Sequence, residues 1–244
     1  MRSLHYDLHL HSCLSPCADD EMTPMNLAGM LKLAGIELAA LTDHNTARNC
    51  PAFFEACRAY GILPVAGMEL TTAEEIHMVC LFPALDYALK FDSEVALHRM
   101  PMKNRPDLFG HQLLCGAGDE ILGEEDALLA AATDLSLDDA YGLVTRHGGA
   151  CYPAHIDRES GGILAILGTL PPTPPFSAVE VRDIKNEASL RASHPLPKLV
   201  LTSSDAHFLT GIPDASATLQ LSGETEEELR EDLIRLLSGK KAPL

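Results

Sequence analysis

The sequence has few basic residues: 18 lysines and arginines against 35 aspartates and glutamates, for a formal charge of −17 at pH 7. Proteins that bind nucleic acid without sequence preference need a basic surface, so this balance argues against broad nucleic-acid binding. It does not exclude a small anionic substrate, because bound metal ions can reverse the local potential whatever the charge of the whole chain.

Signals of several other protein classes are also absent. No basic segment followed by a long apolar run opens the sequence, and no stretch is apolar and long enough to cross a membrane. The seven cysteines show no regular disulfide framework, so reduced thiols and a cytoplasmic location are expected. Neither a G-x-G-x-x-G motif nor a P-loop occurs, which disfavours a nucleotide-cofactor fold.

Short apolar segments alternate with helix-like segments along the chain, a pattern typical of βα units around a parallel sheet. Helices are predicted to begin at Thr23-Pro24, at Ser136 and at Thr225, where N-cap residues precede amphipathic runs. The strand-like segments are residues 6–11, 38–43, 63–69, 77–82, 150–155, 178–181, 199–205 and 218–221.

About eight strands in 244 residues, 46% of them hydrophobic, predict an α/β fold in one domain over residues 1–244. A TIM-like barrel, distorted or one unit short, is favoured, and an open doubly wound sheet is the alternative. Residues 85–135 break the alternation and are interpreted as an insertion between barrel strands. Its basic side chains could form a lid over an anionic substrate, although a solvated loop is the favoured reading.

Histidine and acidic residues recur where the predicted strands end. His9 and His11 lie two apart, so they point to one face of their strand. The other strand-end residues are Asp43, His44, Glu69, His155, Asp205 and His207. His77 instead begins a strand. Because strand ends converge on one mouth of a barrel, and imidazole with carboxylate suits Zn, Mn or Fe, the sequence predicts a site for several metal ions.

Six short motifs carry these residues in a fixed order. They are DLHLHS at residues 7–12, TDHN at 42–45, GME at 67–69, EIH at 75–77, PAHIDR at 153–158 and SDAH at 204–207. The ordered set resembles the PHP (polymerase and histidinol phosphatase) family. The resemblance implies a distorted (β/α)7 barrel with two or three divalent metal ions, zinc being favoured over manganese or iron.

The resemblance also implies which residues bind each ion. The first ion would be held by His9, His11, Glu69 and Asp205. Glu69 would bridge to a second ion, bound also by His77 and His155.

A third ion would be held by His44 and His207 with one ligand from the loop after the first strand. The family usually has His or Asp there, whereas this sequence has Cys17, with Asp19 and Asp20 close by. Asp20 is the expected ligand, and Cys17 and Asp19 are the alternatives.

The implied chemistry is phosphoester hydrolysis, in which two metal ions hold a hydroxide and neutralise the phosphoryl group during in-line attack. Glu69, Asp205 and Arg158 are the expected catalytic residues. Arg158, and more weakly Arg182, are placed to bind phosphate oxygens. The expected substrate is a small phosphorylated metabolite or a nucleotide, such as a nucleoside 3′,5′-bisphosphate. The alternatives are an amidohydrolase-like enzyme that cleaves C–N or C–O bonds, or a non-catalytic metal-binding regulatory or proofreading module.

Overall fold

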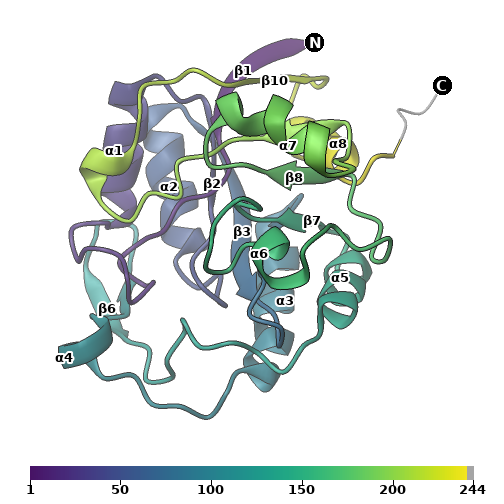
Figure 1. The fold of residues 1–244 in the computed structure, drawn as a ribbon. Helices are drawn as coiled ribbons and strands as arrows, with labels where there is room; N and C mark the ends of the chain where they lie inside the picture. The colour runs from purple at the N-terminus through teal and green to yellow at the C-terminus, as the bar shows by residue number, and fades with distance from the viewer. Residues whose placement is uncertain (241–244) are drawn as a thin grey trace.

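The computed structural model describes residues 1–240 of the chain, so the last four residues of the predicted domain lie outside the described part (Figure 1). Each strand-like segment of the sequence overlaps a strand, although the segment 6–11 shares only residues 6 and 7 with β1. The main sheet has six strands in the order β10-β1-β2-β3-β4-β7. Their bounds are β1 Arg2–Asp7, β2 Leu38–Leu41, β3 Leu63–Thr71, β4 His77–Phe82, β7 Ala150–Pro153 and β10 Thr218–Leu221. A parallel pair, β8 (Ala178–Glu180) and β9 (Leu199–Leu201), continues beside β7.

The strands curl into a barrel-like arrangement whose two ends meet. Beyond β9, the backbone N–H of Asp205 donates to the carbonyl of His9 at 3.0 Å, and Leu10 forms an isolated parallel bridge with Ala206. The predicted α/β class is therefore confirmed. His9 and His11, which were expected on a strand, lie just after β1 ends at Asp7, in the segment that makes this closing contact.

A strict (β/α)7 alternation does not hold, because β3 and β4 form an antiparallel hairpin. Only residues 72–76 separate the two strands, too few for the crossover helix that a parallel neighbour requires. β4 also runs antiparallel to β7, and β10 antiparallel to β1. The hairpin explains why His77 begins a strand yet lies near Glu69: in an antiparallel pair the start of one strand faces the end of the other.

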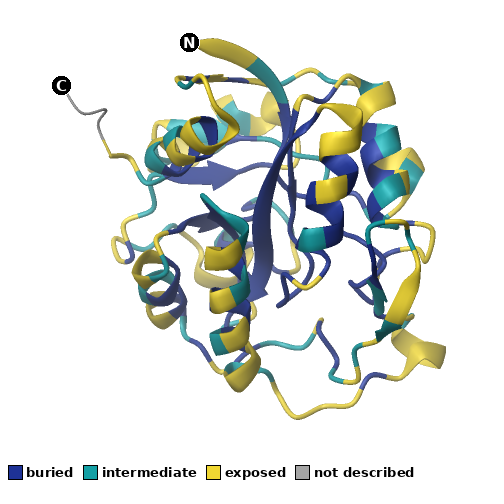
Figure 2. Cartoon of the chain, turned by 180° about the vertical axis from the view of Figure 1, so that it is seen from behind, coloured by how far each residue is buried: buried dark blue, intermediate teal, exposed yellow. Residues whose placement is uncertain are grey.

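The helices cover the sheet with their apolar faces and leave their outer faces exposed (Figure 2). The helices of ten or more residues are α1 Pro24–Ala34, α2 Cys50–Tyr60, α3 Leu85–Val95, α5 Leu137–Arg146 and α8 Glu226–Leu237. The shorter ones are α4 Pro106–Phe109, α6 Ile163–Leu167 and α7 Glu187–Ser193. β2 and β3 are buried along their whole length, as expected for strands covered on both faces. No helix within residues 1–240 is long and apolar enough to cross a membrane.

Two of the predicted helix starts have the expected caps. The Ser136 side chain accepts the backbone N–H of Asp139, and Thr225 and Glu228 form a reciprocal capping box. Thr23 precedes α1 in extended conformation but does not cap it, because its hydroxyl donates instead to the carboxylate of Asp119.

The segment 85–135 begins with α3, which packs on β3 and β4, and continues through α4 into a hairpin of β5 (Leu113–Cys115) and β6 (Ile121–Glu124). Five of its six basic side chains have carboxylate neighbours, Lys90 with Asp86 among them. The other pairs are His98 with Asp134, Arg99 with Asp92, Arg105 with Asp107, and His111 with Glu124. This local neutralisation does not support the interpretation of the segment as a cationic lid.

Candidate metal centre

The carboxylate of Glu69, near the C-terminal end of β3, is the centre of a buried histidine cluster. Its side chain is 1% exposed. Five imidazole nitrogens lie close to its two oxygens: His9 Nε2 (3.2 Å), His77 Nδ1 (2.9 Å) and His155 Nε2 (3.1 Å) at Oε1, and His11 Nε2 (3.2 Å) and His44 Nδ1 (3.0 Å) at Oε2. Histidines from four separate parts of the chain therefore meet at one carboxylate.

Asp205 extends this cluster from the segment after β9. Its Oδ1 lies 3.4 Å from Nε2 of His9 and 3.2 Å from Nε2 of His11. The backbones of Asp205 and His155 adopt positive φ angles of 50° and 26°. Non-glycine residues in such conformations are strained by about 1–3 kcal/mol each, and they concentrate at functional sites.

Ligand atoms in the cluster form three groups in which every atom lies within 4.8 Å of the others. The groups are His9, His11, Glu69 and Asp205; His44, Glu69 and His77; and His11, His44 and His207. The first is the set that the sequence motifs imply for one ion. The second contains His44 where the motifs imply His155, although His155 also reaches Glu69.

Unpaired polar atoms in this cluster indicate that it fits metal ions. His44 Nδ1, Glu69 Oε2 and Asp205 Oδ1 are buried without a hydrogen-bond partner among the described residues. His44 Nδ1 and Glu69 Oε2 are 3.0 Å apart, yet they are not oriented as a hydrogen bond. Buried polar atoms without partners are costly, and coordination to divalent ions would satisfy all three.

Neighbouring side chains fix which nitrogen the first two histidines present. His9 Nδ1 lies 2.8 Å from Glu180 Oε1, and His11 Nδ1 lies 2.9 Å from the hydroxyl of Ser15. Ser15 in turn donates to Asp43 Oδ1 at 2.8 Å. With the ring proton held on Nδ1, each Nε2 is free to bind a metal ion.

These supporting residues were missed by the sequence reasoning. For Glu180 a signal existed, since it lies near the end of the strand predicted at residues 178–181, as the other site residues lie at the ends of theirs. Ser15 had no such signal, because it lies in the loop after β1.

The charges of the cluster follow from burial and from these contacts. Burial disfavours the imidazolium of His11, but the adjacent carboxylates of Asp205 and Glu69 stabilise it more strongly and raise its pKa to about 9. Burial, joined by repulsion from His11, lowers the pKa of His44 to about 4 and that of His207 to about 3. Burial alone would raise the pKa of Glu69, but the surrounding histidines hold it well below its usual range.

The three loop residues considered for the third ion lie at the rim. Cys17, Asp19 and Asp20 are exposed, and within residues 1–240 none of them belongs to the three ligand groups. Desolvation and the Glu69 carboxylate raise the pKa of the Cys17 thiol to about 12. The structure brings His44 and His207 together with His11, and leaves the loop ligand apart from them.

A polar cavity of about 400 Å³ opens beside the cluster. Its lining is His155, Arg158, Glu180, Arg182, Ser203, Ser204, Asp205 and His207. Arg158 Nη1 donates to Asp205 Oδ2 at 3.1 Å, so it reaches the cluster directly.

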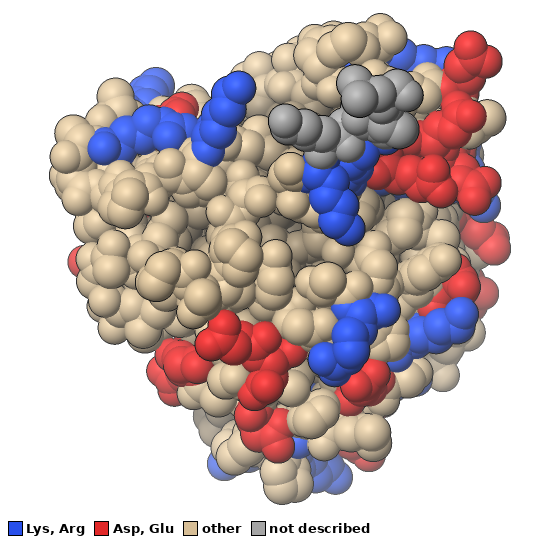
Figure 3. Space-filling view, turned by 90° about the vertical axis from the view of Figure 1, so that its right-hand side faces the viewer, with Lys and Arg blue, Asp and Glu red and all other residues tan. Residues whose placement is uncertain are grey.

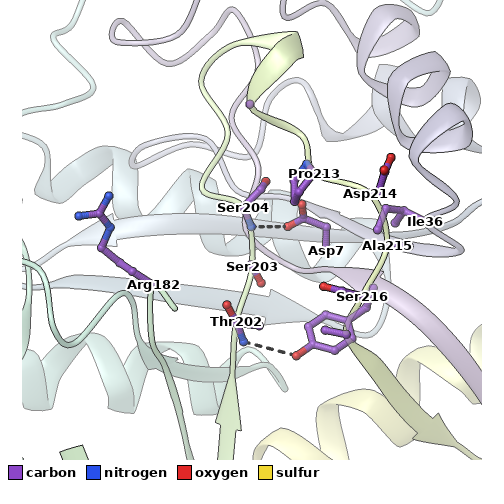
Figure 4. A pocket seen from close by; sticks show the side chains of 13 residues that line it. Asp7, Ile36, Arg182, Thr202, Ser203, Ser204, Pro213, Asp214, Ala215 and Ser216 are labelled. Atoms are coloured by element: carbon purple, nitrogen blue, oxygen red, sulfur yellow. Dashed lines mark hydrogen bonds between the residues drawn. The ribbon is translucent and has the colours of Figure 1, made fainter. Parts of the chain in front are cut away.

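Arg182 also lines an adjoining cavity of about 230 Å³ (Figure 4). There Asp7 Oδ1 accepts the backbone N–H of Ser204 at 3.2 Å, and burial raises the pKa of Asp7 to about 6. In Figure 4 the guanidinium of Arg182 lies apart from the Asp7 side chain.

Solved structures with this fold include endonuclease Q and a protein assigned as a phosphoesterase. The lesion-specific endonuclease Q from Pyrococcus furiosus superposes with a TM-score of 0.67 and 17% identity, covering 98% of this chain and 56% of that one. Endonuclease Q in complex with a 27-mer duplex substrate with an abasic lesion at the active site gives 0.60 and 17%, covering 94% and 56%. A Bifidobacterium adolescentis protein assigned as a metal-dependent phosphoesterase gives 0.55 and 18%, covering 83% and 87%.

The chain thus spans a little over half the length of the endonuclease Q chains. At these identities the likeness concerns the fold. No curated protein matches the sequence.

The expectation of a small substrate, with broad nucleic-acid binding disfavoured by the net charge, is wrong. Endonuclease Q shares this fold and has been solved with duplex DNA at its active site. The net charge of a chain does not describe the charge at one site: on the face in Figure 3, lysines and arginines gather in several separate groups among the acidic ones. The charge balance therefore does not decide the class of substrate.

The model of one family, the PHP domain, matches residues 7–163, which is more than half of the chain and includes five of the six motifs. The cluster around Glu69 is built largely from those motifs. The chain belongs to the PHP domain family.

Proposed function

We propose that the protein is a metal-dependent phosphoesterase with two or three divalent ions around Glu69, zinc being favoured over manganese or iron. The observation that carries the proposal is a carboxylate within 3.2 Å of five imidazoles, beside a cavity that holds two arginines. Imidazole with carboxylate is a ligand set for zinc, manganese and iron.

Each ion has its own proposed ligands. His9, His11, Glu69 and Asp205 would hold the first, and Glu69 with His77 and His155 the second. His44 and His207, with Asp20 from the loop, would hold the third. When bound, the ions would supply Lewis-acid activation of water and neutralise charge on the phosphoryl group.

The arginines give this site its preference for phosphate. Arg158 and Arg182 line the cavity beside the cluster, and a guanidinium can pair two N–H groups with phosphate oxygens. A neutral amide would offer no charge to either guanidinium and would leave Arg158 with Asp205 as its one anionic partner, which disfavours the amidohydrolase alternative. Arg158 would then exchange its bond with Asp205 for a bond with the substrate.

A panel of substrates, tested on metal-loaded protein, checks the proposal. It contains phosphomonoesters including a nucleoside 3′,5′-bisphosphate, a phosphodiester, single-stranded DNA, duplex DNA with an abasic site, and amides. We expect hydrolysis of at least one phosphate ester, loss of activity with a chelator, and no cleavage of amides. Asp205→Asn, purified in parallel, controls for a contaminating phosphatase.

Comparison of the two DNA substrates with the small esters in the panel decides whether the substrate is a free nucleotide, another metabolite or a nucleic acid. Cleavage of amides alone, or no cleavage of any ester by fully loaded protein, would overturn the proposal.

A further inference from the structure

A second cavity adjoins the metal centre, and its lining is largely apolar, unlike that of the polar cavity beside Arg158. Its volume is about 640 Å³, and His77 belongs to its lining. The polar cavity is lined by His155 instead, and the two linings share no residue. His77 and His155 approach the same oxygen of Glu69, at 2.9 and 3.1 Å. The two cavities therefore flank one carboxylate of the proposed metal centre.

The wall of the second cavity is formed largely by exposed apolar side chains. Met100, Met102 and Phe109 come from the segment 85–135 and are 46%, 48% and 43% exposed, and Ile166 of α6 is 37% exposed. Single exposed apolar residues are ordinary on protein surfaces. A group of them in one cavity beside a candidate catalytic centre is typical of a ligand site.

The charges around this cavity exclude a second phosphate there. Among residues 1–240, every basic side chain of the segment except Lys103 is paired with a carboxylate, and Lys103 does not line the cavity. Glu75 and Glu159 do line the cavity, and neither has an ion-pair partner within residues 1–240. An anion would meet two carboxylates here, whereas on the other side of Glu69 it would meet Arg158 and Arg182.

We propose that this cavity receives an uncharged apolar or aromatic group on the alcohol part of the substrate, while the phosphate faces the two arginines. The inference rests on the proposed phosphoesterase function and names its substrate class: phosphate esters whose alcohol carries such a group. It also gives the segment 85–135 a role, which is to form one wall of the substrate site.

Binding of non-hydrolysable phosphonates to the metal-loaded protein tests the proposal without relying on turnover. Calorimetry would compare 1-naphthylmethylphosphonate with methylphosphonate, which share the phosphonate and differ in the aromatic group. We expect the naphthyl compound to bind roughly ten- to a hundredfold more tightly, as for other groups that fill an apolar pocket.

Variants of the cavity wall locate the effect. Met102→Gln and Phe109→Ser should each reduce the preference for the naphthyl compound severalfold and leave the Kd of methylphosphonate unchanged. Leu97→Gln is the matched control, because Leu97 lies in the same segment, is 81% exposed and does not line the cavity. Using two variants keeps the test valid if one of them fails to fold.

Three outcomes would overturn the inference. The wild-type protein could bind the two phosphonates with equal affinity, the wall variants could lose affinity for both compounds equally, or neither compound could bind. Failure of the proposed function looks different. In that case the naphthyl preference and its loss in the variants would remain, but no phosphate ester in the panel would be hydrolysed.

Discussion

Glu180 Oε1 lies 2.8 Å from Nδ1 of His9, and both side chains are buried. The same oxygen accepts the backbone N–H of His155 at 3.1 Å. One carboxylate at the end of β8 therefore fixes the ring orientation of one candidate metal ligand and the backbone of another. Such supporting carboxylates hold a histidine in the tautomer that binds metal and increase its basicity.

Removing Glu180 should weaken metal binding without removing a ligand. We expect Glu180→Ala to lower metal affinity by about 10–100-fold, as for other residues that orient metal-binding histidines. The metal affinity of Glu180→Gln should lie between those of Glu180→Ala and wild type, because the amide oxygen of glutamine can still accept the Nδ1 proton of His9. Competition with a chromogenic chelator measures the affinity. Glu187→Ala is the control, since Glu187 contacts Arg191 and lies outside the site. Equal metal affinity in Glu180→Ala and wild type would refute the positioning role.

Arg158 should affect substrate binding more than metal content. Its side chain is 41% exposed and its contact is a single bond to Asp205. Arg158→Ala should therefore raise KM on the best phosphate ester and leave the number of bound metal ions unchanged. Lys at this position should restore only part of the effect, because it lacks the planar fork. Arg105→Ala, which removes an exposed arginine paired with Asp107, is the control. Unchanged kinetics in Arg158→Ala would mean that its ion pair with Asp205 is its whole role.

Metal uptake should release protons at neutral pH. The pKa of His11 is raised to about 9 because the adjacent carboxylates of Asp205 and Glu69 outweigh the effect of burial, so in the metal-free protein this ring is an imidazolium at pH 7. A metal ion needs the neutral ring, and metal affinity should therefore rise with pH up to about 9, by about tenfold per pH unit for each proton displaced. His44, with a pKa lowered to about 4, is already neutral and contributes no proton.

Calorimetric titration at pH 7, in buffers with different ionisation enthalpies, counts the released protons. At least one should appear for the first ion bound. An apparent enthalpy that is independent of the buffer would contradict the assignment.

The third ion is the least complete part of the site, and metal counting on two variants identifies its loop ligand. Asp20 is the proposed ligand, and Cys17 and Asp19 are the alternatives, although all three are exposed at the rim. We expect Asp20→Ala to lose one metal equivalent and Cys17→Ser to lose none. Loss in the cysteine variant alone would make the ligand a thiolate, which favours zinc or iron. If both variants keep all their metal, neither residue is a ligand and Asp19 is the next to test.

The sequence predicts what depends on local pattern and on order along the chain. All eight strand segments and the histidine motifs were readable, because apolar runs and strand-end residues are local features. Glu180 stands at a strand end like the other site residues, but its partner His9 lies 171 residues away, and the local pattern does not show that the two side chains meet. The β3–β4 hairpin was also missed, because an apolar run reads alike in a parallel and in an antiparallel strand. The apolar wall around Met102 and Phe109 arises only when the segment folds back toward His77.

The metal content of the wild-type protein, purified without chelators and then reconstituted, tests the central claim most directly. A cluster built around the shared carboxylate of Glu69 predicts two to three equivalents of zinc, manganese or iron per chain by elemental analysis. The same measurement on Glu69→Gln should show fewer equivalents, because that carboxylate would belong to more than one ion. At most one equivalent in the wild type, even after reconstitution, would contradict the account.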